Sequence, residues 1–372
     1  MVMSALPNAL SDLPTPALLL DWPVALRNIE TAARFVDGKP VRLRPHFKNH
    51  KCPTLAIAQL TGGGCVGMTV ATVAEAAALV DAGMDDILIA NEVVGTAKIA
   101  RLVDLSERAV VRVVVDTFEN AQTISKAAID ASTRIGTLVE IDIGSHRCGV
   151  SPGAPVLDLT RRLLDLPGLR FDGLHAYHGH VVGNFDRAER DAAARETMIP
   201  AIESRHLLES DGIACGILTG AGTATFYIVG EMDDVDELQI GSYVTMDWSY
   251  TDRVGDMFDI ALTVLASVIS ATTDRFVLDV GVKGVADEYG HPRILDHPEF
   301  EVPRFRAEEH TIVHAPNHGI RVGDRVRVLP SHCCATCNLH RQMVLHEGET
   351  VRDVWPMYSQ GYGLDEYFDD NP

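Results

Sequence analysis

Short apolar segments alternate with amphipathic segments over the first two thirds of the chain. The apolar segments are five to eight residues long, which is typical of strands buried on both faces of a parallel sheet. The eight predicted strands are Val41–Lys48, Cys65–Val70, Asp86–Ala90, Val110–Asp116, Thr137–Gly144, Phe171–Tyr177, Gly216–Gly220 and Glu237–Val244. Eight strands with helices between them favour an α/β fold of the (β/α)₈ TIM-barrel type over an open doubly wound sheet.

Three of the intervening segments carry helix signals. In Thr72–Ala82 a threonine stands three residues before Glu75, the spacing of a capping box, and Gly83 follows as a stop signal. Leu157–Leu166 and Ala188–Ser210 repeat apolar residues every three to four positions, which predicts one buried helix face.

The pattern changes after about residue 250, where the predicted strands are separated by Gly, Pro and Asp turns and no long helix is predicted. These strands are Asp259–Ser270, Arg275–Val280, Arg325–Leu329, Met343–His346 and Val351–Trp355. We therefore expect two domains, a barrel over residues 15–250 and a smaller β-domain over residues 251–372 together with residues 1–14.

Composition and charge narrow the class of protein. The chain has 372 residues, 46% of them hydrophobic, and its 32 Lys and Arg against 52 Asp and Glu give a net charge of −20. This acidity excludes nucleic acid and anionic membranes as main partners, since both need clustered basic residues. No apolar run reaches the length of a membrane span and the first residues lack a secretory signal pattern, so we expect a cytoplasmic enzyme.

The segment Arg44–Lys51 (RPHFKNHK) stands at the end of the first predicted strand. A lysine at the mouth of a barrel, partly desolvated and flanked by basic groups, has a lowered pKa and can form a Schiff base with an aldehyde. A solvated basic loop is the alternative that this segment alone leaves open.

A glycine-rich turn, Thr219–Thr223, follows the seventh predicted strand. Small residues let backbone amides approach an anion, and barrels often bind phosphate at the loops after their last strands. The turn after the eighth strand, Gly241–Tyr243, could add donors. Glycine turns are also common without any ligand, so the alternative of an ordinary turn stays open.

Three of the seven cysteines crowd into Cys333–Cys337, directly after His332. A thiolate beside an imidazole is a Zn²⁺-type ligand pair, and a pair with no second pair nearby is typical of an open, catalytic site. A buried turn of small residues is the alternative, since free cysteine packs as a modest hydrophobe.

Taken together, the motifs resemble one family. Seven motifs follow one another along the chain: RPHFKNHK, GSHRCGV (144–150), AYHGH (176–180), GAGT (220–223), GSYVTMD (241–247), LDVGVK (278–283) and PSHCCATCNLH (330–340). Their order resembles that of the D-threonine aldolase/D-serine dehydratase family. The members of this family are alanine-racemase-like enzymes that use pyridoxal 5'-phosphate. The resemblance runs from about Thr15 to Trp355. It implies a barrel, a β-domain and a homodimer.

The resemblance also implies roles for single residues. Lys48 matches the lysine that binds the cofactor covalently. The other cofactor-binding positions are His46, Arg147, Tyr177, Gly222, Thr223, Gly241, Ser242 and Tyr243. His332 and Cys334 match the metal pair, which binds Zn²⁺ or Mn²⁺ in this interpretation.

The chain departs from the aldolase pattern at the general base. Where many aldolases carry a further histidine after AYHG, this chain has Gly183. His178 and His180 are the histidines that could take its place as catalytic residues. Asn317 stands where the family has an acidic residue. Met68–Glu75 resembles the dehydratase branch, whereas AYHG and Asn338–His340 resemble the aldolase branch, so the sequence lies between the two.

The predicted activity is that of a lyase on D-3-hydroxy amino acids. The preferred prediction is retro-aldol cleavage to glycine and an aldehyde. The alternative is a D-serine or D-3-hydroxyaspartate dehydratase, which gives a 2-oxo acid and ammonia and uses Lys48 as the base at Cα. A racemase of the same fold and a non-catalytic carrier of pyridoxal phosphate are the two remaining interpretations; neither needs a metal pair.

Overall fold

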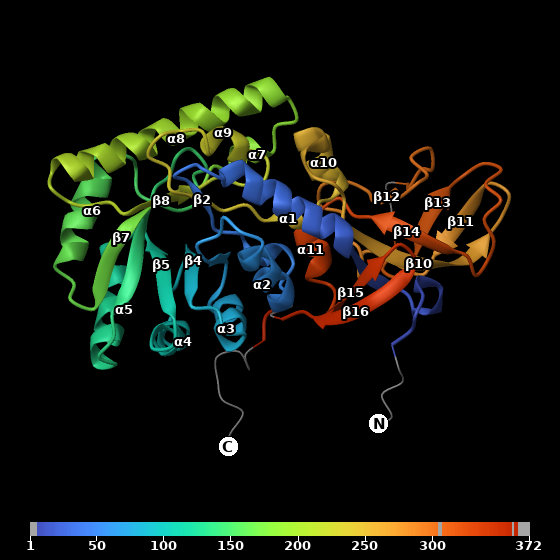
Figure 1. Ribbon diagram of the computed structural model, residues 1–372, viewed down its shortest axis with the longest axis horizontal. Helices are drawn as coiled ribbons and strands as arrows, with labels where there is room; N and C mark the ends of the chain where they lie inside the picture. The colour runs from blue at the N-terminus through green and yellow to red at the C-terminus, as the bar shows by residue number, and fades with distance from the viewer. Residues whose placement is uncertain (1–5, 304–306, 359–360, 364–372) are drawn as a thin grey trace, which may run out of the picture. The chain divides into compact units, whose positions relative to one another are not determined.

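The computed structural model describes residues 6–303, 307–358 and 361–363, and these form two compact units (Figure 1). The barrel unit comprises the described residues of Ala32–Lys48, Leu55–Gly241 and Tyr362–Pro372, and the β-unit those of Met1–Thr31, Asn49–Thr54 and Ser242–Gly361. The division passes through helix α1 (Trp22–Val36), between Lys48 and Asn49, and through helix α2 (Pro53–Thr61).

Eight parallel strands make up the barrel unit. In sheet order they are β2 (Arg42–Leu43), β9 (Glu237–Leu238), β8 (Ile217–Gly220), β7 (Leu169–Ala176), β6 (Ile135–Glu140), β5 (Val110–Val115), β4 (Asp86–Glu92) and β3 (Met68–Val70). Isolated bridges from Leu43 to Cys65 and from His46 to Thr69 join the two ends of this order. The predicted barrel is confirmed.

Helices connect these strands, and Figure 1 shows α3 to α6 on the outside of strands β4 to β7. They are α3 (Val73–Asp81), α4 (Thr96–Ser106), α5 (Phe118–Asp130), α6 (Ala154–Leu164), α7 (Gly179–Val182), α8 (Arg187–Ser210) and α9 (Phe226–Val229). The hydroxyl of Thr72 accepts a hydrogen bond from the Glu75 amide at 3.1 Å, as the capping box predicts, and the Glu75 carboxylate accepts one from the Ala71 amide at 2.7 Å.

The first and last barrel strands are shorter than predicted. Each has two residues, and 3₁₀ turns at Phe47–Asn49 and Ser242–Val244 occupy the rest of the predicted segments. Pro45 has no N–H to donate to the ladder. The amides of Arg44 and His46 on either side of it still donate to carbonyls of the neighbouring segment, both at 2.9 Å, so strand-like pairing continues toward Lys48.

The β-unit contains a mostly antiparallel sheet. Its order is β12 (Arg293–Ile294), β14 (Arg325–Leu329), β10 (Leu262–Ala271), β1 (Ala17–Asp21), β15 (Gln342–Glu347) and β16 (Thr350–Pro356), and β11 (Arg275–Leu278) pairs with β10 and with β13 (Thr311–His314). Only β1 and β15 run parallel among these pairs. Two short helices, α10 (Trp248–Val254) and α11 (Cys333–Cys337), accompany the sheet.

The domain boundaries in the structure differ from those expected from the sequence. Strand β1 lies within the segment assigned to the barrel, residues 15–250, yet it pairs with β10 and β15 of the β-unit. Leu19 of β1 packs there with Leu10, Leu265 and Val344. Residues 242–250, also assigned to the barrel, belong to the β-unit as well.

A membrane-spanning helix is missing from the described residues: none of their helices is both long and apolar enough to cross a bilayer.

Candidate active site

An aromatic ring flanked by two cations stands at the strand ends of the barrel unit. Lys48 lies in the 3₁₀ turn after β2, and its Nζ is 5.7 Å from the ring centroid of Tyr177, the residue that follows β7. The guanidinium carbon of Arg147 is 5.4 Å from the same centroid. The structure thus brings together three residues that are far apart in the sequence and that the motifs predict to bind the cofactor.

His46 adds a buried imidazole to this group. Among the described residues its Nδ1 has no hydrogen-bond partner, and burial, followed by the charge of Lys48, lowers the pKa of His46 well below its usual range. Buried polar atoms in folded proteins nearly always have a hydrogen-bond partner, so a polar atom of a bound ligand is a suitable partner for this nitrogen.

A buried polar network that the sequence analysis missed lies in the same unit. The carboxylate of Glu140 at the end of β6 contacts the His175 imidazole of β7. The other ring nitrogen of His175 is 3.2 Å from the side-chain oxygen of Gln239, whose amide donates to Thr219 at 3.0 Å. The sequence does contain a signal for this network: its polar residues stand at the carboxyl ends of apolar strands, where the active sites of barrel enzymes lie.

The glycine-rich turn after β8 contains a residue in the left-handed region of backbone conformation. Ala221 has a φ of +61°, and a Cβ at Gly222 would lie 3.7 Å from the Tyr177 ring, so the turn lies against that ring. Thr223 and Thr225 are buried. Gly241 belongs to this unit, whereas Ser242 and Tyr243 begin the next segment of the β-unit and are buried there.

The two histidines considered as catalytic bases have different surroundings. His178 is completely buried, its Nε2 is 2.8 Å from the Thr225 hydroxyl and its Nδ1 is 3.4 Å from the Thr197 hydroxyl. Burial, followed by the charge of His180, lowers the pKa of His178 to about 4. His180 in α7 is exposed. A neutral, enclosed His178 is suited to holding the Thr225 turn, and only His180 is open to solvent.

A cluster of Glu92, Asp116 and Cys148 was not predicted. One ligand atom from each lies within 4.8 Å of the others, which is a spacing that can hold a metal ion. Burial and the neighbouring Glu92 raise the pKa of Cys148 to about 11. Without a metal the thiol is therefore protonated at neutral pH, and a metal ion held here would displace that proton.

The β-unit holds the predicted metal pair. His332 precedes α11 and Cys334 lies within it, and Nδ1 of His332 is 2.5 Å from Oε1 of Glu288. Burial opposes a charge on His332, but the Cys334 thiolate and the Glu288 carboxylate outweigh burial and raise the pKa of His332 to about 10. Nitrogen, sulfur and carboxylate oxygen together form a donor set typical of Zn²⁺. Glu288 was not predicted, since it is distant in the sequence.

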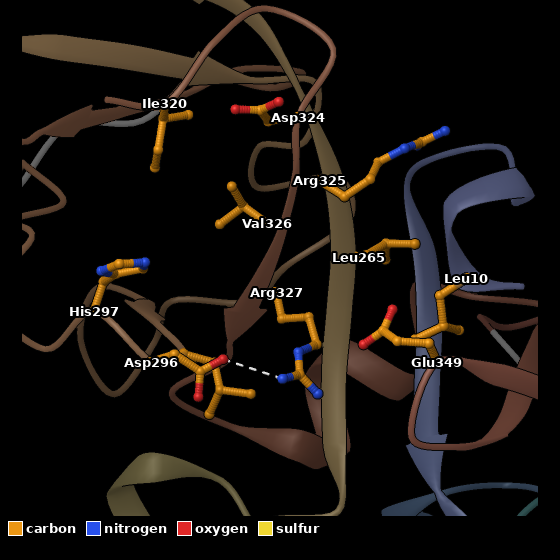
Figure 2. A pocket seen from close by; sticks show the side chains of 11 residues that line it. Leu10, Leu265, Asp296, His297, Ile320, Asp324, Arg325, Val326, Arg327 and Glu349 are labelled. Carbon is orange, nitrogen blue, oxygen red and sulfur yellow. Dashed lines mark hydrogen bonds and ion pairs between the residues drawn. The ribbon is translucent and has the colours of Figure 1, made fainter. Parts of the chain in front are cut away.

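A cavity elsewhere in the β-unit has a volume of about 450 Å³. Figure 2 shows Arg327 turned toward Asp296, to which it is bonded at 3.1 Å. Arg325 donates to Ser267 and Thr15. None of the predicted site residues lines this cavity.

Fold and site together define an alanine-racemase-type barrel enzyme with an added β-domain. The alanine racemase N-terminal domain model matches residues 25–248, and a model of the serine dehydratase domain matches residues 261–346. The chain belongs to the D-threonine aldolase/D-serine dehydratase-like family of alanine-racemase-fold enzymes.

Two of the similar curated proteins are aldolases. The chain is 38% identical over 365 residues to a D-threonine aldolase of Arthrobacter sp., covering 95% of both chains. It is 33% identical to a 3-hydroxy-D-aspartate aldolase of Paracoccus denitrificans, over 95% of this chain and 94% of that one.

Solved structures include both branches of the family. A D-threonine aldolase from Filomicrobium marinum superposes with a TM-score of 0.91 at 36% identity, over 95% of this chain and 97% of that one. The D-threo-3-hydroxyaspartate dehydratase from Delftia sp. HT23 gives a TM-score of 0.85 at 27% identity, over 96% of this chain and all of that one.

Proposed function

We propose that this protein is a pyridoxal 5'-phosphate- and metal-dependent lyase that cleaves the Cα–Cβ bond of D-3-hydroxy amino acids to glycine and an aldehyde. The observation that carries the proposal is the combination of two residue groups in one chain. Lys48, Arg147 and Tyr177 gather at the barrel strand ends, and His332 and Cys334 stand beside Glu288 in the β-unit. The similarity to aldolases over 95% of the chain supports the assignment.

The barrel residues suit pyridoxal phosphate. Lys48 supplies the amine that binds the cofactor aldehyde, Arg147 and Tyr177 supply a cation and an aromatic face, and the turn at Gly222 and Thr223 supplies backbone amides for the phosphate. His46, Gly241, Ser242 and Tyr243 complete the proposed set. When bound, this cofactor is an electron sink for negative charge that develops at Cα.

The His332 and Cys334 pair suits Zn²⁺ or Mn²⁺, with Glu288 as a third donor. Such an ion lowers the pKa of a coordinated hydroxyl, here the 3-hydroxyl of the substrate. Solved variants of a D-threo-3-hydroxyaspartate dehydratase replace a histidine and a cysteine two positions apart, which is the spacing of His332 and Cys334, and the cysteine variant is described in a metal-free form.

Aldol cleavage also needs a group that accepts the hydroxyl proton. We assign this step to His180 in preference to His178, because His180 is exposed while His178 is enclosed and bonded to two threonine hydroxyls. The pKa of His178, near 4, also makes it a poor base at neutral pH.

A dehydratase is the second candidate function. Gly183 stands where many aldolases carry a further histidine, and a dehydratase is similar over nearly the whole chain. In that reaction Lys48 removes the Cα proton and hydroxide leaves from Cβ.

Product analysis by proton NMR separates the two functions. The purified protein, with pyridoxal phosphate and Zn²⁺ or Mn²⁺, is given D-threonine, D-serine and D-3-hydroxyaspartate in separate reactions. Glycine plus an aldehyde is the expected result, and a 2-oxo acid plus ammonia would establish the dehydratase.

The variant Cys334→Ala tests the metal assignment. It should keep the visible absorbance of the cofactor and lose turnover; full turnover that resists a chelator would refute the metal assignment.

We further propose a homodimer located in the cytoplasm. The supporting observation is the family resemblance of the motifs between Thr15 and Trp355. Sedimentation velocity of the purified chain tests the dimer directly.

A further inference from the structure

Asn49, the residue after Lys48, is fully buried in the β-unit. Its side-chain nitrogen lies 2.9 Å from Sγ of Cys333 and 3.5 Å from Sγ of Cys334, and its side-chain oxygen accepts a hydrogen bond from the Thr245 hydroxyl at 2.9 Å. The amide thus directs its two N–H donors at two thiols and uses its oxygen for a third partner.

This pairing is unusual for a buried amide. Sulfur in a neutral thiol is a weak acceptor, whereas hydrogen bonds to an ionised acceptor are stronger. The hydrogen bonds from a carboxamide to two cysteine sulfurs are therefore strongest when at least one sulfur carries a negative charge. A metal-bound thiolate carries such a charge.

The loop that bears the metal pair is tied to the segment of Asn49 by a second contact. Nζ of Lys51 donates to the Asn338 side-chain oxygen at 2.7 Å. The Cys333 amide is fixed separately, because it donates to the buried Asp247 carboxylate at 2.8 Å. Residues 49–51 thus fix the side chains at both ends of α11, while Asp247 fixes its backbone.

We propose that Asn49 is a positioning residue that orients the Cys334 thiolate for a divalent metal ion. It also connects the metal loop, through one peptide bond, to the lysine that binds the cofactor. The inference rests on the proposed function, since it takes His332 and Cys334 as the metal pair. Partners of metal ligands orient those ligands, and their loss typically weakens metal binding by about 10- to 100-fold.

The test is a Co²⁺ titration followed by the thiolate-to-cobalt charge-transfer absorbance in the near ultraviolet. Full-length wild type, Asn49→Leu and Thr245→Val are compared. Asn49→Leu keeps the γ-branched shape and removes both donors to sulfur. Thr245→Val, the matched control, removes a hydrogen bond from the same buried cluster but leaves both donors in place. We expect Asn49→Leu to bind Co²⁺ about 10- to 100-fold more weakly and Thr245→Val to bind close to wild type.

Two results would overturn the inference: unchanged Co²⁺ affinity in Asn49→Leu, or equal losses in both variants, which would indicate general packing. If Asn49→Leu does not fold, as judged by pyridoxal phosphate absorbance, Asn49→Ala takes its place with the same expectations. A wild-type protein whose Co²⁺ spectrum lacks the charge-transfer band, or keeps it in Cys334→Ala, would refute the metal pair itself. A band that needs Cys334 but not Asn49 would refute only the role of Asn49.

Discussion

Tyr177 meets positive charge from two side chains, because Lys48 and Arg147 both lie within 6 Å of its ring centroid. A cation over an aromatic face is held by the ring quadrupole. The ring therefore attracts the lysine amine toward the strand ends, while the lysine stays partly exposed.

Lys48→Ala tests the covalent role at this position. Without the amine, pyridoxal phosphate has no covalent link to the chain, so the visible absorbance of the bound cofactor is expected to disappear. Absorption spectra of the dialysed proteins are the measurement. Arg147→Lys is the control, since it keeps a cation and should retain the band; an unchanged spectrum in Lys48→Ala would remove Lys48 from this role.

His178 predicts a pH dependence of stability. Its pKa is lowered from 6.5 to about 4 in the folded protein, so between these pH values the unfolded chain binds a proton that the folded chain does not. The free energy of unfolding therefore falls as pH decreases below about 6.5, by about 1 kcal/mol at pH 5.5 and of order 3 kcal/mol by pH 4.

Urea unfolding of wild type and His178→Gln at pH 7.5 and 5.5 measures this effect. The variant should lose less stability between the two pH values than wild type does. The buried His46 and the half-buried His340, whose pKa values are also lowered, contribute equally to both proteins, so identical pH slopes would contradict the role of His178.

At the scale of elements, an ion-pair network connects strands that are not neighbours in the chain. Arg44, two per cent exposed and just after β2, donates two hydrogen bonds to Glu237 of β9, at 2.7 and 2.8 Å, and one to Asp86 of β4 at 2.5 Å. Arg112 of β5 extends the network from Asp86 to Asp172 of β7. A Cβ at Gly67 would collide with the Arg44 guanidinium, so the arginine leaves no room for a side chain there.

Glu237→Gln should destabilise the barrel strongly. Removing one partner leaves the charge of Arg44 buried and only partly compensated, which costs about 3–5 kcal/mol. Thermal or urea unfolding measures the loss. Glu347→Gln breaks the exposed Glu347–Arg352 pair and should cost no more than about 1 kcal/mol; equal losses in the two variants would show that burial does not set the cost.

The elements also show what local pattern could predict. Strands β5 and β14 and helix α8 lie close to their predicted bounds, because their apolar periodicity is complete within a single segment. Strands β2 and β9 are shorter than predicted, and 3₁₀ turns at Phe47–Asn49 and Ser242–Val244 follow them near the site. Strand β1 was not predicted, since its partners β10 and β15 lie more than two hundred residues away.

At the scale of the whole molecule, the lysine proposed to bind the cofactor and the proposed metal pair belong to different compact units: Lys48 lies in the barrel unit, and His332 and Cys334 lie in the β-unit. A ligand that binds only the folded state stabilises it, by about 2.7 kcal/mol when its concentration is 100 times its Kd. Pyridoxal phosphate without metal and Zn²⁺ without pyridoxal phosphate should therefore each raise the unfolding temperature of the apoprotein.

Thermal unfolding of three proteins checks this expectation. Lys48→Ala should lose most of the rise caused by pyridoxal phosphate and keep the rise caused by Zn²⁺, and Cys334→Ala should show the reverse. A variant in which neither ligand raises the unfolding temperature would indicate that the two sites depend on each other.

The sequence by itself determined the barrel, the β-rich second unit and the separate motifs for cofactor and metal, because apolar periodicity and ligand spacing are local properties. Only the tertiary structure decided which side chains meet. It placed Glu288 beside His332, enclosed His178 among two threonine hydroxyls, and directed Asn49 at two thiols. The physical reason is the same in each case: burial and hydrogen bonding depend on partners that lie from about twenty to nearly three hundred residues away, and no local pattern records them.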